Sequence, residues 1–435
     1  MDQHSDFEVY QFDNGFRLFH KRTPTHTIFA NLRINHGALN EREGEEGTAH
    51  FLEHMLVEGG TERYAPGKQA KIRGMFGYTN AMTSRDRTMI PWGMIPYELD
   101  NYLDMSSQMV FHPSLDKKVL EQQKKVVMRE ISRAKGSPSF DDFFRFYQPN
   151  LTRDRDHTYF VLGKEEVIID ITEEKLRDFH SRGYNPNNMT LMISGDLPED
   201  IVERVGKYFA CQLSGNGEQF NLSPVSPLEK RVMRHSYAED LLNKENPNGS
   251  NSYLIIGVVV PDEFHPDSAA LRVASEVLGK SWTGGLKKKI RSEKGMSYDI
   301  GSNYSGDKRF GRFEVSGKIR STDQDESIGI IFEELGKLGT VLPDESEVAA
   351  ARMRASYKAA NYISSSFGSL VTIDPVNVSS ISMMDYTLEG RPRLEEKLLR
   401  ISLVTPEDVK RVSEKYLPLD SGSNYVLLLR DPLKR

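Results

Sequence analysis

Two histidines four residues apart are the most informative chemical feature of this sequence. His50 and His54 belong to the pentapeptide His-Phe-Leu-Glu-His. On a helix this spacing places both imidazoles on one face, one turn apart. Two such nitrogens can chelate one Zn²⁺ ion. Glu53 stands directly before the second histidine, where its carboxylate can lie beside a reacting water without binding the metal. The pattern therefore predicts a zinc site with a built-in general base.

The residues around the histidine pair are typical of a helix that is largely buried. Thr48 provides a signal for the start of a helix, and Gly59-Gly60 provides a stop. Apolar residues flank the histidine face on both sides: Phe51, Leu52, Met55 and Leu56. The alternative is a helix whose histidines are ordinary surface or core residues. Two buried imidazoles without partners would be costly, whereas a bound metal satisfies them, so the metal site is the stronger interpretation.

A zinc site of this kind needs a third protein ligand, and the segment 116–135 offers one. The segment is strongly helical in composition and is followed by Gly-Ser-Pro. Glu130 shares a helical face with Gln123 and several valines at a period of 3.6 residues. Taken alone, Glu130 would be interpreted as a solvated carboxylate beside Arg129 or Arg133. Together with the histidine pair, it becomes the best candidate for the third ligand.

The elements that must position these residues divide into two halves of similar order. The first half is predicted to contain strands at 17–20, 28–34 and 190–194 around long helical stretches. The second half is predicted to contain strands at 251–260, 298–304, 312–319 and 424–429 and helices at 268–279, 324–338 and 344–362. The intervening residues are rich in Gly, Ser, Asn and Pro, a linker composition. We therefore expect domains at 1–213 and 229–435, joined by a linker at 214–228.

Composition bounds the classes of function. The 435 residues are 38% hydrophobic and carry a net charge of −6. These values describe a globular protein of two or more domains without a basic footprint for nucleic acid. The longest apolar runs, 253–260 and 425–429, are too short to span a bilayer. The polar, acidic first residues match neither a secretory signal nor a transit peptide. With Cys211 as the single cysteine, an intrachain disulfide is excluded and a cytoplasmic location is expected.

Several short motifs, taken in order, resemble the pitrilysin/insulinase family of zinc peptidases. The pentapeptide has the form H-x-x-E-H, the inverzincin signature, and it is followed at a distance by Glu130. The segment 80–83, Asn-Ala-Met-Thr, is similar to an edge strand of the family. The segments 184–189 and 194–196 are similar to a later family element. The resemblance spans nearly the whole chain, and the family includes short bacterial proteins and the mitochondrial processing peptidases.

The resemblance implies an α+β fold of two structurally similar domains. Each would be a mostly antiparallel sheet flanked by helices, and the two would form a clamshell. Only the first domain would bind metal, one Zn²⁺ per chain, through His50, His54 and Glu130, with Glu53 as the general base. The activity implied is that of a zinc metalloendopeptidase acting on peptides or unfolded protein segments enclosed between the domains.

The family also suggests residues for the substrate and the transition state. A peptide would add as a strand to the edge at Asn80, Ala81 and Thr83. In the second half, residues 291–298 resemble the element R-x-x-x-G-L-x-Y, with Met in place of Leu. The resemblance therefore implies that Arg291 and Tyr298 reach the peptide carbonyl and stabilise its developing negative charge.

One departure from the family leaves an alternative function open. The family commonly has a second Glu seven residues before the ligand Glu, and Gln123 stands at that position here. The lost charge could reduce zinc affinity or rate, which would suit a catalytically weak or inactive member acting as partner subunit of a processing peptidase. Because Arg291 and Tyr298 belong to this chain, a homodimer or a monomer is favoured over a heterodimer with a related subunit. A zinc-stabilised binding module would need a fourth ligand, and no suitably spaced Cys or His lies near the motif.

Overall fold

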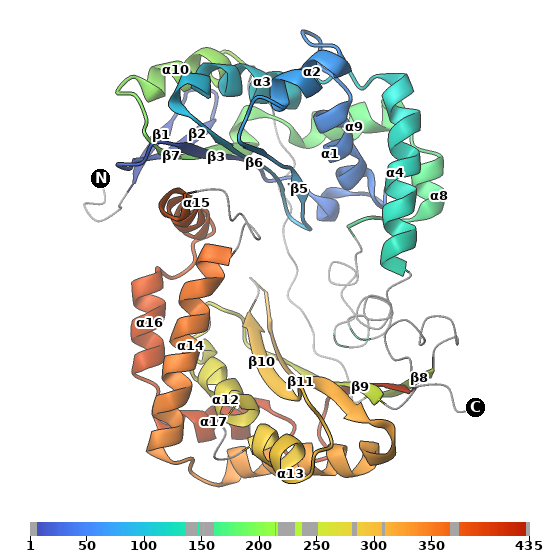
Figure 1. Cartoon of the computed structure of the whole chain (residues 1–435), viewed down its shortest axis with the longest axis vertical. Helices are drawn as coiled ribbons and strands as arrows, with labels where there is room; N and C mark the ends of the chain where they lie inside the picture. The colour runs from blue at the N-terminus through green and yellow to red at the C-terminus, as the bar shows by residue number, and fades with distance from the viewer. Residues whose placement is uncertain are drawn as a thin grey trace. The chain divides into compact units, whose positions relative to one another are not determined.

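The computed structural model describes residues 7–135, 147, 151, 161–213, 215, 231–236, 251–280, 285–306, 309–365 and 374–431. The chain forms two compact units, each an α+β arrangement of one sheet and several helices (Figure 1). Unit 1 consists of Met1–Arg133, Tyr159–Asn221 and Ile363–Gly390, and unit 2 of Ala134–Thr158, Leu222–Tyr362 and Arg391–Arg435. The domains predicted at 1–213 and 229–435 are each continuous in sequence. The compact units are not, because unit 1 includes a segment from the second half of the chain and unit 2 includes one from the first half. Apart from residue 215, the predicted linker at 214–228 lies outside the described residues.

Unit 1 is built on a seven-stranded sheet with the order β1-β2-β7-β3-β6-β4, and β5 also pairs with β6. The strands are β1 (Glu8–Gln11), β2 (Arg17–Arg22), β3 (Ile28–Ile34), β4 (Tyr78–Thr79), β5 (Met82–Thr83), β6 (Thr88–Met94) and β7 (Met189–Gly195). Neighbours are antiparallel except for β2 and β7, which are parallel. All residues of the central strand β3 are buried, because both faces of the sheet are covered.

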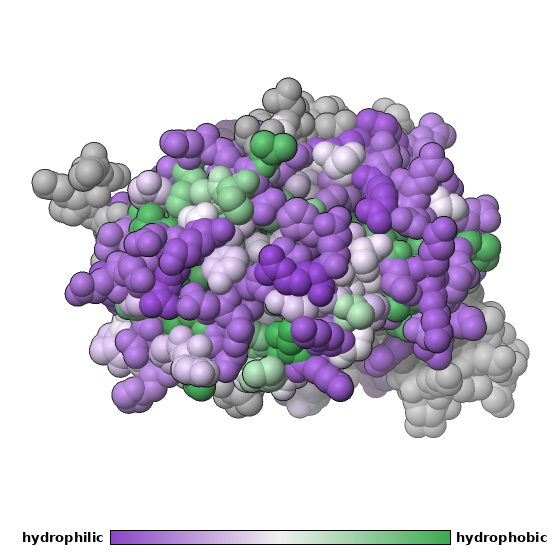
Figure 2. Space-filling view, turned by 90° about the horizontal axis from the view of Figure 1, so that it is seen from above, coloured by the Kyte–Doolittle hydropathy of each residue, from purple (hydrophilic) through white to green (hydrophobic). Residues whose placement is uncertain are grey.

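The first two segments of unit 1 contribute seven α-helices among the described residues. They are α1 (Thr48–Glu58), α2 (Pro66–Arg73), α3 (Leu99–Phe111), α4 (Lys117–Lys135), α8 (Glu165–Ile169), α9 (Glu173–Gly183) and α10 (Ile201–Phe209). Phe51, Leu52 and Met55 of α1 are fully buried in the same apolar core as the strand residues Leu32 and Ile90. Seen from above, the surface is mainly hydrophilic with scattered hydrophobic side chains (Figure 2). None of the described helices combines the length and apolar character needed to cross a membrane.

Helix α15 (Pro375–Leu388) belongs to unit 1 although it comes from the last part of the chain. It packs on β7 and β3, on the opposite face of the sheet from α3 and α10 (Figure 1). At one end, buried Asn377 accepts a hydrogen bond from Thr23 Oγ1 (2.7 Å) and donates one to the carbonyl of Thr27 (3.1 Å). At the other end, Arg33 of β3 pairs with Asp385 and with Glu389, just beyond the helix. Buried charges are tolerated when they are paired, so the helix is fixed at both ends.

Unit 2 contains a five-stranded sheet with the order β10-β11-β9-β12-β8. Its strands are β8 (Arg231–Ser236), β9 (Asn251–Val260), β10 (Gly301–Gly306), β11 (Gly311–Arg320) and β12 (Val426–Asp431). The longer helices are α12 (Ser268–Lys280), α13 (Gln324–Thr340), α14 (Glu345–Ser365), α16 (Leu394–Ser402) and α17 (Pro406–Tyr416). The predicted strands and helices of the second half agree with β9, β10, β11, β12, α12, α13 and α14 to within a few residues, whereas β8, α16 and α17 were not predicted.

The two sheets share one pairing scheme. In each, the first long strand is parallel to the last, as β2 is to β7 and β8 is to β12. The last strand is antiparallel to the second, as β7 is to β3 and β12 is to β9. The second strand is in turn antiparallel to a strand that follows the next long helix, as β3 is to β6 after α1 and β9 is to β11 after α12. The predicted α+β class with mostly antiparallel sheets is therefore confirmed for each unit. The clamshell remains a prediction.

Candidate metal centre

The start of α1 is fixed by a carboxylate that lies six residues before Gly47, the N-cap of the helix. Gly47 adopts a φ of 99°, and a Cβ there would lie 2.8 Å from the carbonyl oxygen of Leu162, so glycine is required. Thr48 is the first helical residue, as predicted, but its side chain does not cap the helix. Instead, buried Glu41 accepts hydrogen bonds from the backbone N–H groups of Gly47 (2.9 Å) and Ala49 (2.7 Å). A carboxylate also suits the positive end of the helix dipole. Glu41 is thus a structural residue that no local sequence pattern pointed to.

The three predicted metal ligands come together in unit 1. The Nε2 atoms of His50 and His54 lie 3.6 and 3.5 Å from Oε2 of Glu130 on α4. Their potential ligand atoms all lie within 4.8 Å of one another, and among the described residues this is the one His, Cys, Asp or Glu cluster of that kind. Two ligand atoms bound to a tetrahedral zinc at about 2.1 Å are roughly 3.4 Å apart. The spacing of the cluster therefore fits a single ion.

The protonation of the imidazoles also suits metal binding. Burial, with a smaller effect of His54, lowers the pKa of His50 to about 3, so its imidazole is neutral near pH 7. The Nδ1 atom of His54 lies 3.0 Å from Oε1 of Gln123 on α4. Because an amide oxygen can only accept, Nδ1 carries the proton and Nε2 keeps a lone pair. Gln123 thus holds His54 in the tautomer that presents Nε2 beside Glu130.

Glu53 lies beside this cluster and is held by the edge of the sheet. Thr83 of β5 donates a hydrogen bond of 2.6 Å from its hydroxyl to Oε2 of Glu53. Burial raises the pKa of Glu53, and the charge of Glu130 acts in the same direction, while the Thr83 hydrogen bond opposes the rise. A carboxylate with a raised pKa is better matched to accepting and returning a proton near neutral pH. Thr83 was predicted to bind substrate, and its hydrogen bond to Glu53 was not predicted.

The predicted substrate edge consists of β4, β5 and the two residues between them. Asn80 is exposed and Ala81 half-buried, and the backbone N–H of Asn80 donates to the carbonyl of Pro91 in β6 (3.1 Å). In the part of the chain that the structure describes, β4 and β5 pair with β6 alone, and β4 ends the sheet. An edge of this kind can accept one more strand.

Arg291 and Tyr298 contact each other within unit 2. Arg291 lies in the π-helical segment η5 (Lys287–Glu293), and its guanidinium carbon is 4.4 Å from the centroid of the Tyr298 ring, a cation–π contact. The strand predicted from Tyr298 begins only at Gly301, and the Tyr298 side chain is 79% exposed. Their part in the chemistry at the metal ligands stays a prediction.

Comparison with known proteins gives consistent matches along the chain. Residues 18–144 match a family model described as Insulinase (Peptidase family M16), and residues 170–355 match one described as Peptidase M16 inactive domain. The chain is 25% identical over 331 residues to YmxG of Bacillus subtilis, named an uncharacterized zinc protease, with 76% of this chain and 78% of that protein covered. It is 28% identical over 270 residues to the mitochondrial-processing peptidase subunit beta of Caenorhabditis elegans, with 61% and 56% covered.

Solved structures share the fold over the full length. A protease from Helicobacter pylori superposes with a TM-score of 0.78 at 20% identity, covering 98% of this chain and 99% of that one. A protein from Pseudomonas fluorescens described as a peptidase M16 inactive domain superposes with a TM-score of 0.79 at 16% identity, covering 99% of each chain. At such identities the structures establish the fold of the chain.

Proposed function

Since this chain belongs to the M16 peptidase family, the insulinase family, we propose that it is a zinc-dependent metalloendopeptidase that hydrolyses peptides or unfolded protein segments. The proposal rests on one observation. The side chains of His50 and His54 on α1 and of Glu130 on α4 lie together, and Glu53 of α1 lies beside them. Three protein ligands leave a further position of a tetrahedral ion open, as catalytic zinc sites require. The relative from Bacillus subtilis is named a zinc protease, which supports the same metal.

In this mechanism the chain's own residues hold the metal and move the proton. His50, His54 and Glu130 would hold one Zn²⁺, and bound zinc supplies Lewis-acid chemistry that polarises a carbonyl and acidifies water. Glu53 takes the proton from the attacking water and passes it to the leaving amine. The Thr83 hydroxyl fixes the direction of the Glu53 carboxylate. Gln123 keeps His54 in its ligating tautomer.

The proposed substrate is an extended peptide that pairs with the edge formed by β4 and β5. Asn80, Ala81 and Thr83 lie along that edge, so backbone pairing would carry much of the affinity and tolerate many side chains. Negative charge develops on the scissile carbonyl oxygen in the tetrahedral intermediate. We propose Arg291 and Tyr298 as its donors, because a guanidinium and a phenol are fixed donors of the required kind.

The alternative is a weak or inactive family member acting as a partner subunit. Gln123 supports it, since a neutral side chain replaces the usual carboxylate beside a ligand histidine. The relative from Caenorhabditis elegans is named as a subunit of a peptidase, which supports an assembly with a second chain. The retained ligands and Glu53 favour the active peptidase.

The deciding experiment measures metal content and peptide hydrolysis on the full chain. We expect about one zinc per chain, lost in the His50→Ala, His54→Ala double variant. Glu53→Gln should keep the zinc but lose about 10²–10⁴-fold in kcat, because an amide cannot take the proton. Glu58→Gln, the same change on the same helix, is the matched control and should keep both. A zinc-loaded wild-type protein that cleaves no member of a diverse set of quenched fluorescent peptides would refute the peptidase and favour the partner subunit.

A further inference from the structure

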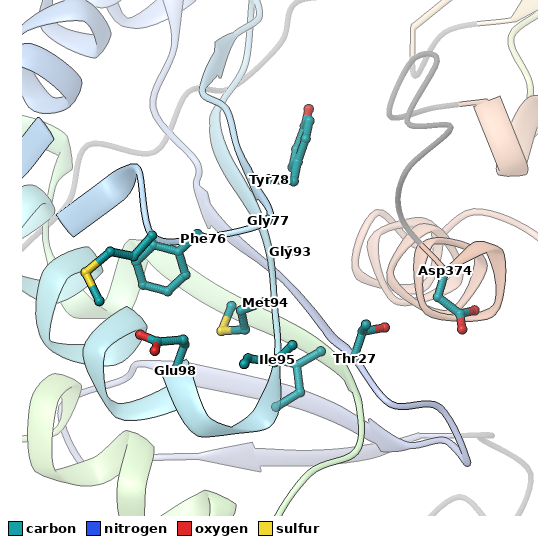
Figure 3. Close-up of a pocket in the computed structure, with 11 residues that line it drawn as sticks. Thr27, Phe76, Gly77, Tyr78, Gly93, Met94, Ile95, Glu98 and Asp374 are labelled. Carbon is teal, nitrogen blue, oxygen red and sulfur yellow. The ribbon is translucent and has the colours of Figure 1, made fainter. Parts of the chain in front are cut away.

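A second binding feature of unit 1 is a cavity of about 300 Å³ beside the start of β4. It is formed by the start of β3 and the residue before it, the end of β6 and residues that follow it, the loop before β4 with the first residue of β4, and the residue before α15 (Figure 3). The lining residues are Thr27, Ile28, Met75, Phe76, Gly77, Tyr78, Gly93, Met94, Ile95, Glu98 and Asp374. The cavity therefore contains neither a metal ligand nor Glu53.

The chemistry of the lining selects its ligand. Met75 and Ile95 are 61% and 55% exposed, so large apolar side chains stand in water at the cavity and would gain from being covered. The two charged lining residues are both acids, and Figure 3 shows Glu98 and Asp374 at opposite ends of the lining. Glu98 accepts a hydrogen bond from Asn101 (2.9 Å), and Asp374 accepts one from the backbone of α15. An apolar group with a positive or neutral neighbour fits this lining, and an acidic neighbour is disfavoured.

The position of the cavity relates it to the proposed substrate edge. Tyr78 lines the cavity and begins β4, and Thr83, five residues later on the same edge, contacts Glu53. Extended chain rises about 3.3 Å per residue, so the two ends of this edge are roughly 16 Å apart. A peptide cleaved beside Glu53 and paired along this edge would reach the cavity about five residues from the scissile bond.

The direction of pairing decides on which side of the bond that residue lies. Antiparallel pairs are the more stable. A peptide antiparallel to the chain direction from Tyr78 to Thr83 runs from the Glu53 end towards the cavity. The residue that reaches the cavity then lies on the carboxyl side of the bond.

We propose that this cavity is a remote subsite that takes a large apolar side chain of the peptide substrate, about five residues to the carboxyl side of the scissile bond. Lysine or arginine next to that side chain is favoured through Glu98 and Asp374. The proposal rests on the proposed function, because it needs a peptide paired to the edge of β4 and β5. It adds a length and sequence preference that the metal ligands themselves do not create.

The test uses a series of peptides that the full-length zinc-loaded protein cleaves at one identified bond. Each peptide carries a single leucine at a different position. Serine occupies the other positions from three to seven residues beyond the bond. We expect leucine near the fifth position to lower KM about tenfold, with kcat unchanged, because a contact kept in the ground state and the transition state changes KM alone. Leucine at the mirrored positions before the bond should have no effect.

Variants of exposed lining residues assign the preference to the cavity. Met75→Ser with Ile95→Ser should abolish the leucine effect while the all-serine peptide is cleaved as before. Ile169→Ser is the matched control, because Ile169 is also exposed (56%) and belongs to the same unit. Glu98→Gln should weaken the preference for a neighbouring lysine.

Three outcomes would overturn the subsite. The first is an equal KM for every position of the leucine. The second is a lower KM only when leucine lies on the amino side of the bond. The third is loss of the leucine effect in the Ile169→Ser control as well. In each of them the all-serine peptide is still cleaved, so the peptidase itself would stand. Failure to cleave any peptide would overturn both proposals together.

Discussion

Gln123, whose amide contacts His54, is the most informative single position to change, because we expect it to set the affinity of the proposed site for zinc. Its oxygen accepts a hydrogen bond from His54 Nδ1, with the two atoms 3.0 Å apart. Loss of such a partner costs about 10–100-fold in metal affinity. Because both residues are half-buried and the acceptor is an uncharged amide, the loss of zinc affinity in Gln123→Ala should fall at the lower end, about tenfold or ~1.4 kcal/mol. Hydrogen bonds to an ionised acceptor are about twice as strong. Gln123→Glu should therefore bind zinc about tenfold more tightly than the wild type.

The assay is competition for zinc between the metal-depleted protein and a chromophoric chelator at fixed pH. It reads metal affinity directly and does not depend on cleavage. Gln122→Ala is the matched control, because Gln122 is the exposed neighbour on the same helix and should leave affinity unchanged. Thermal unfolding of each metal-free variant checks that the fold is intact. A Gln123→Ala affinity within about twofold of wild type, against the tenfold expected, would refute the reasoning. An equal loss in Gln122→Ala would refute it as well.

Three further predictions concern stability and the second unit. His36 is fully buried, and burial lowers its pKa to about 3. As pH falls below about 6.5, this imidazole therefore binds a proton in the unfolded chain but not in the folded one, and the folded state loses stability. This should cost about 2 kcal/mol by pH 5, and urea unfolding should show a flatter decline for His36→Phe; equal declines would count against it. A fragment of residues 1–213 should melt at a higher temperature when residues 363–390 are added as a separate peptide, because α15 covers one face of the sheet. An unchanged melting temperature on addition of the peptide would contradict this. Arg291→Ala or Tyr298→Phe should lower kcat by roughly 10²–10³-fold at unchanged zinc content, and unchanged kcat would exclude them as oxyanion donors.

Local patterns were sufficient to predict which three side chains form the His, His and Glu cluster. The spacing of His50 and His54 predicts their shared face because helix geometry is fixed by the backbone. Glu130 could be chosen because a carboxylate on a face of valines needs a partner, and the structure places it beside both histidines. Strands such as β3 and β9 were predicted at their observed bounds, since their apolar runs are long and clearly delimited.

Features that depend on distant partners could not be predicted. Nothing in the local sequence distinguishes Asn377 from other polar residues. It fixes one end of α15 through hydrogen bonds to threonines some 350 positions earlier. Helix α15 was not among the predicted helices, and its packing on the sheet of unit 1 was not foreseen. Glu41 precedes α1 by several residues, beyond the positions where capping side chains are usually sought. The start of β10 at Gly301 reflects pairing with β11, while Tyr298 alone suggested a strand.

The common strand order of the two sheets has an evolutionary consequence. Such a repeat is what duplication of one ancestral domain leaves behind after the sequences have diverged. The helix in unit 2 that corresponds to α1 is then α12, and buried Glu276 stands as far beyond the end of β9 as His50 stands beyond the end of β3. Glu276 forms ion pairs with Arg354 (3.4 Å) and Lys358 of α14. One copy thus keeps a cluster that suits a metal, and the other has an internal ion pair in its place. The second unit is therefore held together at this place by its own paired charges and does not depend on a bound ion there.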